Sequence, residues 1–383
     1  MKEQSIEASK KKRICIVAEH YPTEEEPMFT FVQQLAYSLS KEGVECNVIA
    51  PQSITRNIIR HQRMKSVYSL DNSPEGIAIK VYRPFFVTVS NVRNRYLQRF
   101  EDWMMGRVIL KTLAKIGSVD AIYCYFWHVA LITSIALKND NTPLYVQASE
   151  CALTIDDYMI TDENLRRIKG VVCASKKNQN ESLEAGLTTI NNTRIIVNGY
   201  RKDQFYSISR SVARKKLNFP QDEFIIAFVG GFIERKGIRE LCEAINQLKD
   251  VKSIFIGTGE IEPACDGILF KGRVAHDKIV NYLNCADVFV LPTKAEGCCN
   301  AIIEALACGL PVISSNKSFN DEILDESCSI RLDESNIQAL IEAISLLQNN
   351  LDKRKQMSKA ALKKAQSLTI ENRAKAIINF VLK

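Results

Sequence analysis

The sequence contains no apolar run that approaches the ~18–20 residues a membrane-spanning helix needs. Its start, MKEQSIEASKKKR, is basic but has none of the apolar stretch that marks a secretory signal. We therefore expect a cytoplasmic protein. With 46% hydrophobic and 25% charged residues the composition is that of a globular protein, and 383 residues suit two domains better than one.

Paired cysteine motifs are also missing, although the chain has 12 cysteines. No Cys-x2-Cys pair is followed by a second one, which the common zinc sites require. Most of the cysteines lie inside apolar runs, as Cys15, Cys124, Cys173 and Cys308 do. We expect free, buried thiols in a reducing compartment and no metal site.

The positive charge is concentrated in one part of the chain. Residues 51–100 contain nine basic and two acidic residues, so their excess of seven equals the net charge of the whole chain, +7. The basic residues are Arg56, Arg60, Arg63, Lys65, Lys80, Arg83, Arg93, Arg95 and Arg99. Such a surface could attract nucleic acid, anionic lipid or a phosphate-bearing substrate, or it could be a solvated face without a ligand.

One part of this region has an amphipathic pattern. Three arginines alternate with apolar side chains where a helix is expected, namely Arg93, Arg95 and Arg99 with Tyr96, Leu97, Phe100 and Trp103. This pattern suits a helix lying at an anionic membrane surface, and it equally suits a helix packed against its own sheet.

Short apolar strands alternate with helical patterns along the first half of the chain. The predicted strands are 13–18, 45–50, 77–82, 121–126, 143–148, 170–174 and 194–197. The predicted helices are about 28–41, 95–116, 129–138, 161–168 and 175–185. Nearly continuous apolar strands separated by helices indicate a parallel sheet covered on both faces.

The same pattern restarts after a polar stretch near 200–222. The predicted strands are 224–231, 253–257, 267–271, 287–291, 311–315 and 328–332, with helices near 237–248, 276–285, 300–308 and 335–348. We expect an α/β protein with an N-terminal domain of residues 1–205 and a C-terminal domain of residues 206–365. A C-terminal helix, about 366–383, should pack back on the first domain. Ligands bind beyond the carboxyl ends of parallel strands, so two such domains facing each other make a cleft.

Two carboxylates flank the start of the helix predicted at 300–308. Glu296 lies in the loop before this helix and Glu304 about one turn inside it. Ionised carboxylates accept hydrogen bonds on both oxygens and so suit the hydroxyl pairs of a sugar or a ribose. The amides of Gly297 to Asn300 would suit an anionic phosphate. Taken alone, the two glutamates could also be surface residues beside a core helix.

A basic loop follows the first strand of the second domain. Gly230 and Gly231 allow a ligand to approach the backbone, and Arg235 and Lys236 precede the next helix. This pair could neutralise a diphosphate, or it could be a solvated turn.

These two stretches together resemble the large retaining glycosyltransferase family 4, with its Glu-x7-Glu signature. The matching residues are Glu296, Gly297, Glu304, Ala305, Ala307, Gly309, Pro311, Val312 and Ile313. Cys298 stands where the family usually has an aromatic residue. The resemblance implies the GT-B architecture, two Rossmann-like doubly wound domains facing across a cleft. It also implies transfer, with retention, from a nucleotide-sugar such as a UDP-sugar to a glycan or lipid-linked acceptor. The setting would be cell-surface polysaccharide or glycolipid synthesis.

The resemblance also implies roles for individual residues. The catalytic candidates are Lys236, Arg235, Glu296 and His128. The donor-binding candidates are Gly230, Gly231, Gly257, Gly259, Arg273, Val274, Gly297, Cys298, Cys299, Asn300, Glu304 and Thr30. The family's arginine after the glycine corresponds to Phe232 here. No D-x-D carboxylate motif is present, so we expect a metal-independent enzyme without a cofactor, in which the basic loop stabilises the leaving diphosphate.

The first domain departs further from the family pattern. Thr30 resembles a threonine that touches the donor phosphate, and a helix N-cap is the alternative for it. Either Tyr125 or His128 corresponds to the family's usual active-site histidine, and the sequence leaves both assignments open. Glu150 stands where a polar contact is expected after the fifth strand.

Two other classes of function share some of these features. A nucleotide-sugar epimerase or a sugar phosphorylase can have the same architecture. A non-catalytic nucleotide- or nucleic-acid-binding protein is suggested only by the basic excess, and no nucleic-acid-binding motif supports it, so we expect no nucleic-acid partner. Besides the donor and the acceptor, the basic region suggests one other partner, the inner face of an anionic membrane, which the protein would bind peripherally.

Overall fold

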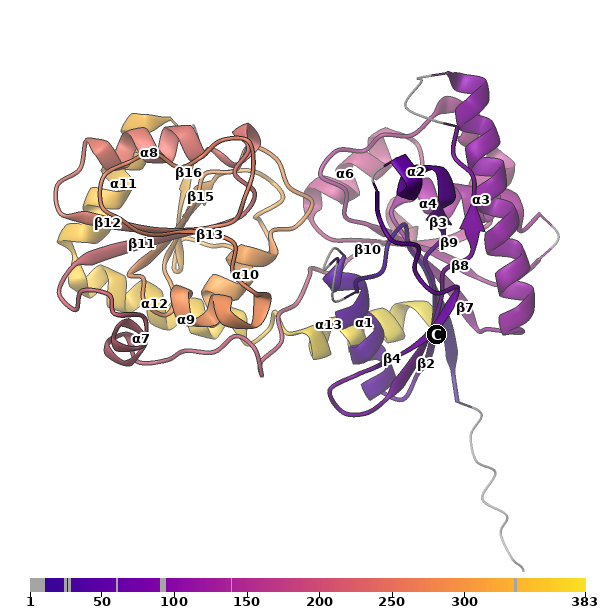
Figure 1. The fold of residues 1–383 in the computed structure, drawn as a ribbon, viewed down its shortest axis with the longest axis horizontal. Helices are drawn as coiled ribbons and strands as arrows, with labels where there is room; N and C mark the ends of the chain where they lie inside the picture. Colours follow the sequence, from indigo (N-terminus) through magenta and orange to yellow (C-terminus); the bar gives the residue numbers. More distant parts are fainter. Residues whose placement is uncertain are drawn as a thin grey trace, which may run out of the picture.

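The structure is a computed structural model that describes residues 11–23, 26, 29–59, 61–89, 94–138, 140–333 and 336–383. Two α/β domains lie side by side, each built around one sheet (Figure 1). The expected fold class, two parallel α/β sheets in two domains, is confirmed. Residues 1–10, Arg60 and Arg93, which entered the analysis of charge and targeting, lie outside the described residues.

The N-terminal sheet has the strand order β10-β9-β8-β7-β1-β2-β5-β4 within the described residues. The strands are β1 Arg13–Val17, β2 Glu45–Ile49, β4 Tyr68–Asn72, β5 Ala78–Tyr82, β7 Ala121–Tyr125, β8 Leu144–Ala148, β9 Ile168–Cys173 and β10 Thr193–Ile195. The central strand β7 is buried at every position, as expected for a sheet covered on both faces.

The edge strand β4 corrects the expectation of a wholly parallel sheet. It pairs antiparallel with β5, so that Ser69 faces Val81 and Leu70 faces Lys80. Its sequence, YSLDN, has few apolar residues because an edge strand has a neighbour on one side only, and its alternate residues are exposed. The sequence pattern therefore gave no strand here.

Helices cover both faces of the N-terminal sheet (Figure 1). They are α1 Thr30–Lys41, α2 Ile54–Ile59, α3 Arg95–Ile116, α4 Trp127–Ala136, α5 Asp162–Arg166 and α6 Lys176–Glu184. The longest, α3, begins where the Asn94 side chain accepts a hydrogen bond from the Tyr96 amide. It packs on α4 at Gly106, where an added Cβ would lie 3.2 Å from the Ala136 Cβ. A small ladder of β3 Gln52–Ser53 with β6 Phe85–Phe86 carries α2.

The C-terminal sheet is parallel throughout, in the order β13-β12-β11-β14-β15-β16. Its strands are β11 Phe224–Val229, β12 Val251–Ile256, β13 Ile268–Gly272, β14 Val288–Leu291, β15 Val312–Ser315 and β16 Ser329–Leu332. The helices are α7 Arg210–Leu217, α8 Ile238–Asn246, α9 Ile279–Leu283, α10 Asn300–Ala307, α11 Ile337–Asn349 and α12 Leu351–Ala365. In α8, Ile238, Leu241, Cys242 and Ile245 form the buried stripe that the helical period requires.

The last helix, α13 (Ile370–Val381), lies against α1 of the N-terminal domain (Figure 1). Its residues Ala374, Ile377 and Val381 belong to the N-terminal core. Beside it the chain crosses between the domains a second time, where Tyr200 bridges Thr369. We retain the domain limits 205/206 and 365/366 as a proposal, and note that the Phe205 side chain already packs in the C-terminal core.

No helix in the described part of the chain is long and apolar enough to cross a membrane. All 12 cysteines are free thiols, and most of them are buried.

Candidate active site

The strongest cluster of charged side chains in the C-terminal domain lies at the carboxyl edge of its sheet. Glu296 is in the loop after β14, while Arg235 and Lys236 are in the turn after β11, and β11 and β14 are neighbours. Lys236 Nζ lies 2.5 Å and Arg235 Nη1 3.1 Å from Glu296 Oε1. The structure thus brings three of the predicted catalytic residues into direct contact.

The geometry of this cluster leaves part of the carboxylate available. Thr293 Oγ1 donates to the same Oε1 atom of Glu296 at 2.7 Å. Among the described residues, all contacts of this carboxylate reach Oε1, so Oε2 remains for a ligand hydroxyl. Glu296 is 8% exposed, and in such a site charge-assisted hydrogen bonds are stronger than in water.

Two glycine-containing loops meet beside this cluster. An added Cβ at Gly257 would lie 1.8 Å from the Gly230 carbonyl oxygen, and one at Gly259 would lie 2.2 Å from the Phe232 carbonyl oxygen. Only glycine therefore allows the loops after β11 and β12 to touch. Gly231 has only ordinary contacts around its position. Phe232 is buried in the core and cannot replace the family's arginine at the surface.

The second signature glutamate has a partner that sequence reasoning missed. Glu304, in α10, lies with its Oε1 atom 2.9 Å from His276 Nε2, which is hydrogen-bond distance. The His276 ring also packs edge-on against the Phe205 ring. Burial lowers the pKa of His276, but the bond to Glu304 outweighs it and the pKa is raised overall. The sequence signal that could have identified this partner was the position of His276, two residues after Val274, one of the donor-binding candidates.

The start of α10 has no side-chain capping hydrogen bond, and Cys299 is at its N-cap. Helix amides without a cap are the usual seat of a phosphate. Asn300 Oδ1 accepts from Asn198 Nδ2 at 2.8 Å, which ties this turn to the crossing segment. Burial raises the pKa of Cys298 to about 11 and that of Cys299 to about 12, so both are neutral thiols.

The remaining donor-binding candidates lie apart from the charged cluster. Arg273 follows β13 and is exposed, without a side-chain partner among the described residues. Val274 packs on the C-terminal core. Thr30 is the first residue of α1, and Phe29, at φ 63°, occupies the N-cap position. The alternative that Thr30 is the helix N-cap is therefore wrong.

The two domains touch at the signature loop. An added Cβ at Gly297 would lie 2.0 Å from the Ser149 carbonyl oxygen, in the loop after β8. Cys151 Sγ lies 3.4 Å from the Ala295 carbonyl oxygen, and the Lys176 amide donates to Glu322 at 3.2 Å. The loop around Glu296 is thus pressed against the N-terminal domain.

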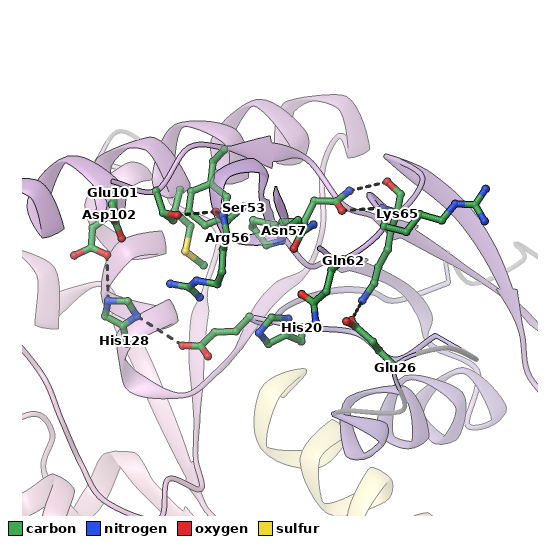
Figure 2. Close-up of a pocket in the computed structure, with 17 residues that line it drawn as sticks. His20, Glu26, Ser53, Arg56, Asn57, Gln62, Lys65, Glu101, Asp102 and His128 are labelled. Carbon is green, nitrogen blue, oxygen red and sulfur yellow. Dashed lines mark hydrogen bonds and ion pairs between the residues drawn. The ribbon is translucent and has the colours of Figure 1, made fainter. Parts of the chain in front are cut away.

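His128 and Tyr125 occupy different environments. Tyr125 is 1% exposed within β7, whereas His128 lies at the start of α4 beside a pocket (Figure 2). His128 Nε2 lies 3.1 Å from Asp102 and its Nδ1 3.8 Å from Glu19. Burial lowers the pKa of His128, but its bonds to these two carboxylates raise it overall to about 10. His128 is thus not in contact with the Glu296 cluster.

Glu150 faces α4 and not the charged cluster. Its Oε1 accepts from the Trp127 amide, the first of that helix, at 2.6 Å. Burial raises the pKa of Glu150 to about 7, although this hydrogen bond opposes the shift.

Comparison with known proteins identifies the chain. Residues 209–364 match the family model "Glycosyl transferases group 1". The putative teichuronic acid biosynthesis glycosyltransferase TuaC of Bacillus subtilis is 26% identical over 356 residues, covering 87% of this chain and 88% of the relative. This protein is a group 1 glycosyltransferase.

Other relatives of the glycosyltransferase agree in class. The capsular polysaccharide biosynthesis glycosyltransferase CapM of Staphylococcus aureus is 27% identical over 167 residues, covering 40% of this chain and 44% of that one. As a retaining family 4 enzyme, the glycosyltransferase is not the binding protein considered above, and the epimerase and phosphorylase alternatives are set aside.

Solved structures show that the glycosyltransferase has the GT-B fold. Sucrose-phosphate synthase from Thermosynechococcus elongatus superposes with a TM-score of 0.74 at 19% identity, over 96% of this chain and 98% of that one. The Anabaena protein HepE, solved in complex with UDP and glucose, superposes with a TM-score of 0.69 at 16% identity, over 98% and 100%.

Proposed function

We propose that this glycosyltransferase uses a UDP-sugar as donor and transfers the sugar to a glycan or lipid-linked acceptor of a cell-surface polysaccharide or glycolipid. The observation that carries the proposal is the contact of Arg235 and Lys236 with Glu296 at the carboxyl edge of β11 and β14. The UDP complex of HepE, a protein of the same fold, supports the choice of nucleotide.

In this proposal the basic pair stabilises the leaving diphosphate. Positive charge held in place before the reaction favours a transition state in which negative charge develops on the phosphate. Arg235 and Lys236 contact Glu296, and the donor diphosphate would share their charge. The amides at the start of α10 add a second group of donors.

The two signature glutamates bind hydroxyl groups in this proposal. Oε2 of Glu296 would accept from hydroxyls of the donor sugar, and Glu304, positioned by His276, would accept from the ribose. The acceptor hydroxyl attacks on the face from which the diphosphate leaves, and a donor phosphate oxygen takes its proton. This path retains the anomeric configuration.

The donor is tested by thermal stabilisation with UDP-, GDP- and ADP-sugars. A ligand at about 100 times its dissociation constant stabilises the folded state by about 2.7 kcal/mol. We expect UDP-sugars to raise the melting temperature most, and no effect of excess EDTA on transfer. Stabilisation by GDP-sugars alone would exclude the UDP assignment, and rescue by Mg²⁺ after inactivation with EDTA would exclude the metal-free mechanism.

We further propose that the outer face of α3 contacts an anionic membrane. Its inner face packs on its own domain through Met105, Ile109 and Leu113, so the packed-helix interpretation holds for that face. The outer face exposes Tyr96, Phe100, Trp103 and Leu110, at helical spacing. The Arg107 guanidinium lies 5.4 Å from the Trp103 ring centroid on the same face.

Co-sedimentation with vesicles tests this contact. We expect binding to phosphatidylglycerol vesicles and not to phosphatidylcholine vesicles, and its loss in a Phe100→Ser, Trp103→Ser double variant. Leu346→Ser, at an exposed apolar residue of α11, is the matched control and should bind normally. Equal partitioning of the double variant and the wild type would exclude this surface.

A further inference from the structure

The pocket beside His128 lies at the carboxyl edge of the N-terminal sheet. Glu19 and His20 follow β1, Gln52 and Ser53 follow β2, and His128 follows β7, and these strands are neighbours. The hollow measures about 940 Å³ including the part open to solvent. On the next strand beyond β7, the loop after β8 touches Gly297 of the donor domain. The pocket therefore lies where an acceptor would approach the donor site.

One wall of the pocket is formed by residues between Ser53 and Lys65, and the buried Gln52 side chain holds the Lys65 end of this segment by hydrogen bonds. Gln52 Nε2 donates to the carbonyl oxygens of Lys65 and Arg83 at 2.8 and 3.0 Å, and Gln52 Oε1 accepts from the Lys65 amide at 3.0 Å. At the other end of the segment, the Arg56 amide donates to Ser53 Oγ. This segment therefore has a fixed start and a fixed end.

The four carboxylates that line the pocket all have partners. Glu26 pairs with Lys65 at 2.5 Å, and Glu101 accepts from the Val89 amide at 2.5 Å. Asp102 and Glu19 both contact His128. Tyr158 also donates its hydroxyl hydrogen to Asp102. The acids are thus engaged within the pocket wall.

Arg56, unlike these four carboxylates, has a side chain without a hydrogen-bond partner in the described part of the pocket. Among the described residues, no hydrogen bond or ion pair reaches its guanidinium, although Glu19 lies close enough for the two charges to interact. Arg63, which also lines the pocket, likewise has no side-chain hydrogen bond or ion pair within the described residues. Figure 2 shows this side chain reaching across the hollow toward His128, with Asn57 and Gln62 lying between Arg56 and Lys65 in that view. A guanidinium without a hydrogen-bond partner, in a pocket that two amide side chains also line, can bind a phosphate through two parallel hydrogen bonds.

The neighbouring residues of α2 are apolar and face the solvent. Ile58 is 65% and Ile59 58% exposed. A short helix that directs Arg56 into a pocket while it exposes two isoleucines fits a ligand with a charged head and an apolar tail.

We propose that this pocket binds a phosphate group of the acceptor through Arg56, Asn57 and Gln62, and that the phosphate is the one that joins the acceptor sugar to a lipid. The inference rests on the proposed function, since it names the acceptor class of that reaction. The phosphate stays bound to the sugar throughout, so the pocket positions the acceptor and takes no part in bond breaking.

The test is titration of the full-length protein with decyl diphosphate below its micellar concentration, and separately with inorganic pyrophosphate. UDP is kept at saturation so that the donor site is blocked. We expect Arg56→Gln to weaken decyl diphosphate binding by a factor of about 10 or more, as for a lost charge-assisted contact. Gln62→Ala should weaken it a few-fold. Arg166→Gln, at an exposed arginine of α5 that pairs with Asp162 and does not line this pocket, should bind like the wild type.

The two probes distinguish the sources of the phosphate. Binding of decyl diphosphate at least tenfold tighter than pyrophosphate supports the lipid-linked phosphate. Equal binding of the two would overturn the lipid part of the proposal, and failure of both probes to bind, or wild-type binding by Arg56→Gln with an unchanged melting temperature, would overturn the site. Loss of UDP stabilisation in the wild type would count against the proposed donor and not against this pocket.

Discussion

At the scale of single residues, Glu296 and Lys236 form the contact on which the proposed chemistry depends. We expect Lys236→Ala and Glu296→Ala each to lower kcat by a factor of about 100 to 1,000, the range for losing one group that stabilises a transition-state charge. Both variants should stay folded. Without Lys236, Thr293 still donates to Glu296, and without the Glu296 carboxylate, Arg235 still donates to the Ala295 carbonyl oxygen.

Steady-state kinetics, with circular dichroism to verify folding, measures this effect. Lys294→Ala is a matched control, since Lys294 pairs with Glu234 and Glu240 outside the cluster. Full activity in either of the first two variants would end the catalytic assignment.

His276 should act on donor affinity more than on rate. Its contact with Glu304 raises the pKa of the imidazole above the ordinary value, so the positive charge is kept to higher pH and is lost as pH rises through the raised pKa. We expect His276→Ala to raise KM for the donor about tenfold or more with little change in kcat, because a hydrogen bond to a charged group is worth about 1.5–3 kcal/mol. A fall in kcat at unchanged KM would contradict this role.

At the scale of elements, Glu150 stabilises the start of α4 from another part of the chain. Phe126, at the N-cap with φ 73°, provides no side-chain cap, and the Glu150 carboxylate accepts the Trp127 amide instead. This hydrogen bond joins the loop after β8 to the start of α4.

The pH dependence of stability follows from the same residue. Burial raises the pKa of Glu150 to about 7, above the ordinary value of 4.5. The folded state then binds the proton more tightly than the unfolded state, so stability falls as pH rises from about 4.5 through 7. Glu150→Gln should abolish this part of the fall. Urea unfolding at pH 5 and pH 8 measures it, and an identical pH dependence in wild type and variant would refute the buried-carboxyl explanation.

At the scale of the whole molecule, Gly297 sets how closely the domains approach. An added Cβ there meets the Ser149 carbonyl oxygen at 2.0 Å, closer than any real contact. We expect Gly297→Ala to hold the domains further apart and to reduce kcat by at least tenfold, because water exclusion and alignment depend on closure.

Small-angle scattering with and without UDP tests this effect. The Gly297→Ala variant should have the larger radius of gyration in both states, while its UDP affinity, set within the C-terminal domain, stays within a few-fold of the wild type. A variant as compact as the wild type would rule out the steric role.

Much of the fold could be predicted because parallel strands buried on both faces leave a strong pattern. The helix over 95–116 was predicted at the bounds of α3, and the other predicted strands and helices differ from the observed ones by a few residues. The elements of the described residues that were missed are β3, β4, β6, α2, α7 and α12. α12 (LDKRKQMSKAALKKA) is rich in lysine and buries only Met357, Ala361 and Ala365, so its apolar stripe is too thin to read.

The candidate site was predictable only where a motif fixes local spacing. Glu296, Glu304, Arg235 and Lys236 were found in this way, and their roles stay predictions until the variants above are tested. His276 was missed because its partner Glu304 is 28 residues away, and nothing local announces a contact over that separation.

The amino-acid sequence by itself determined the two α/β domains, the glycosyltransferase signature and the uneven distribution of positive charge, since each depends on residue type and short-range spacing. Only the tertiary structure decided that one carboxylate oxygen of Glu296 receives two cations and a hydroxyl, and that Arg56 lines the pocket of Figure 2 without a hydrogen bond or ion pair to another described residue. Pairing is a property of side chains brought together from distant segments, and packing, which sums many weak contacts over the whole chain, brings them together.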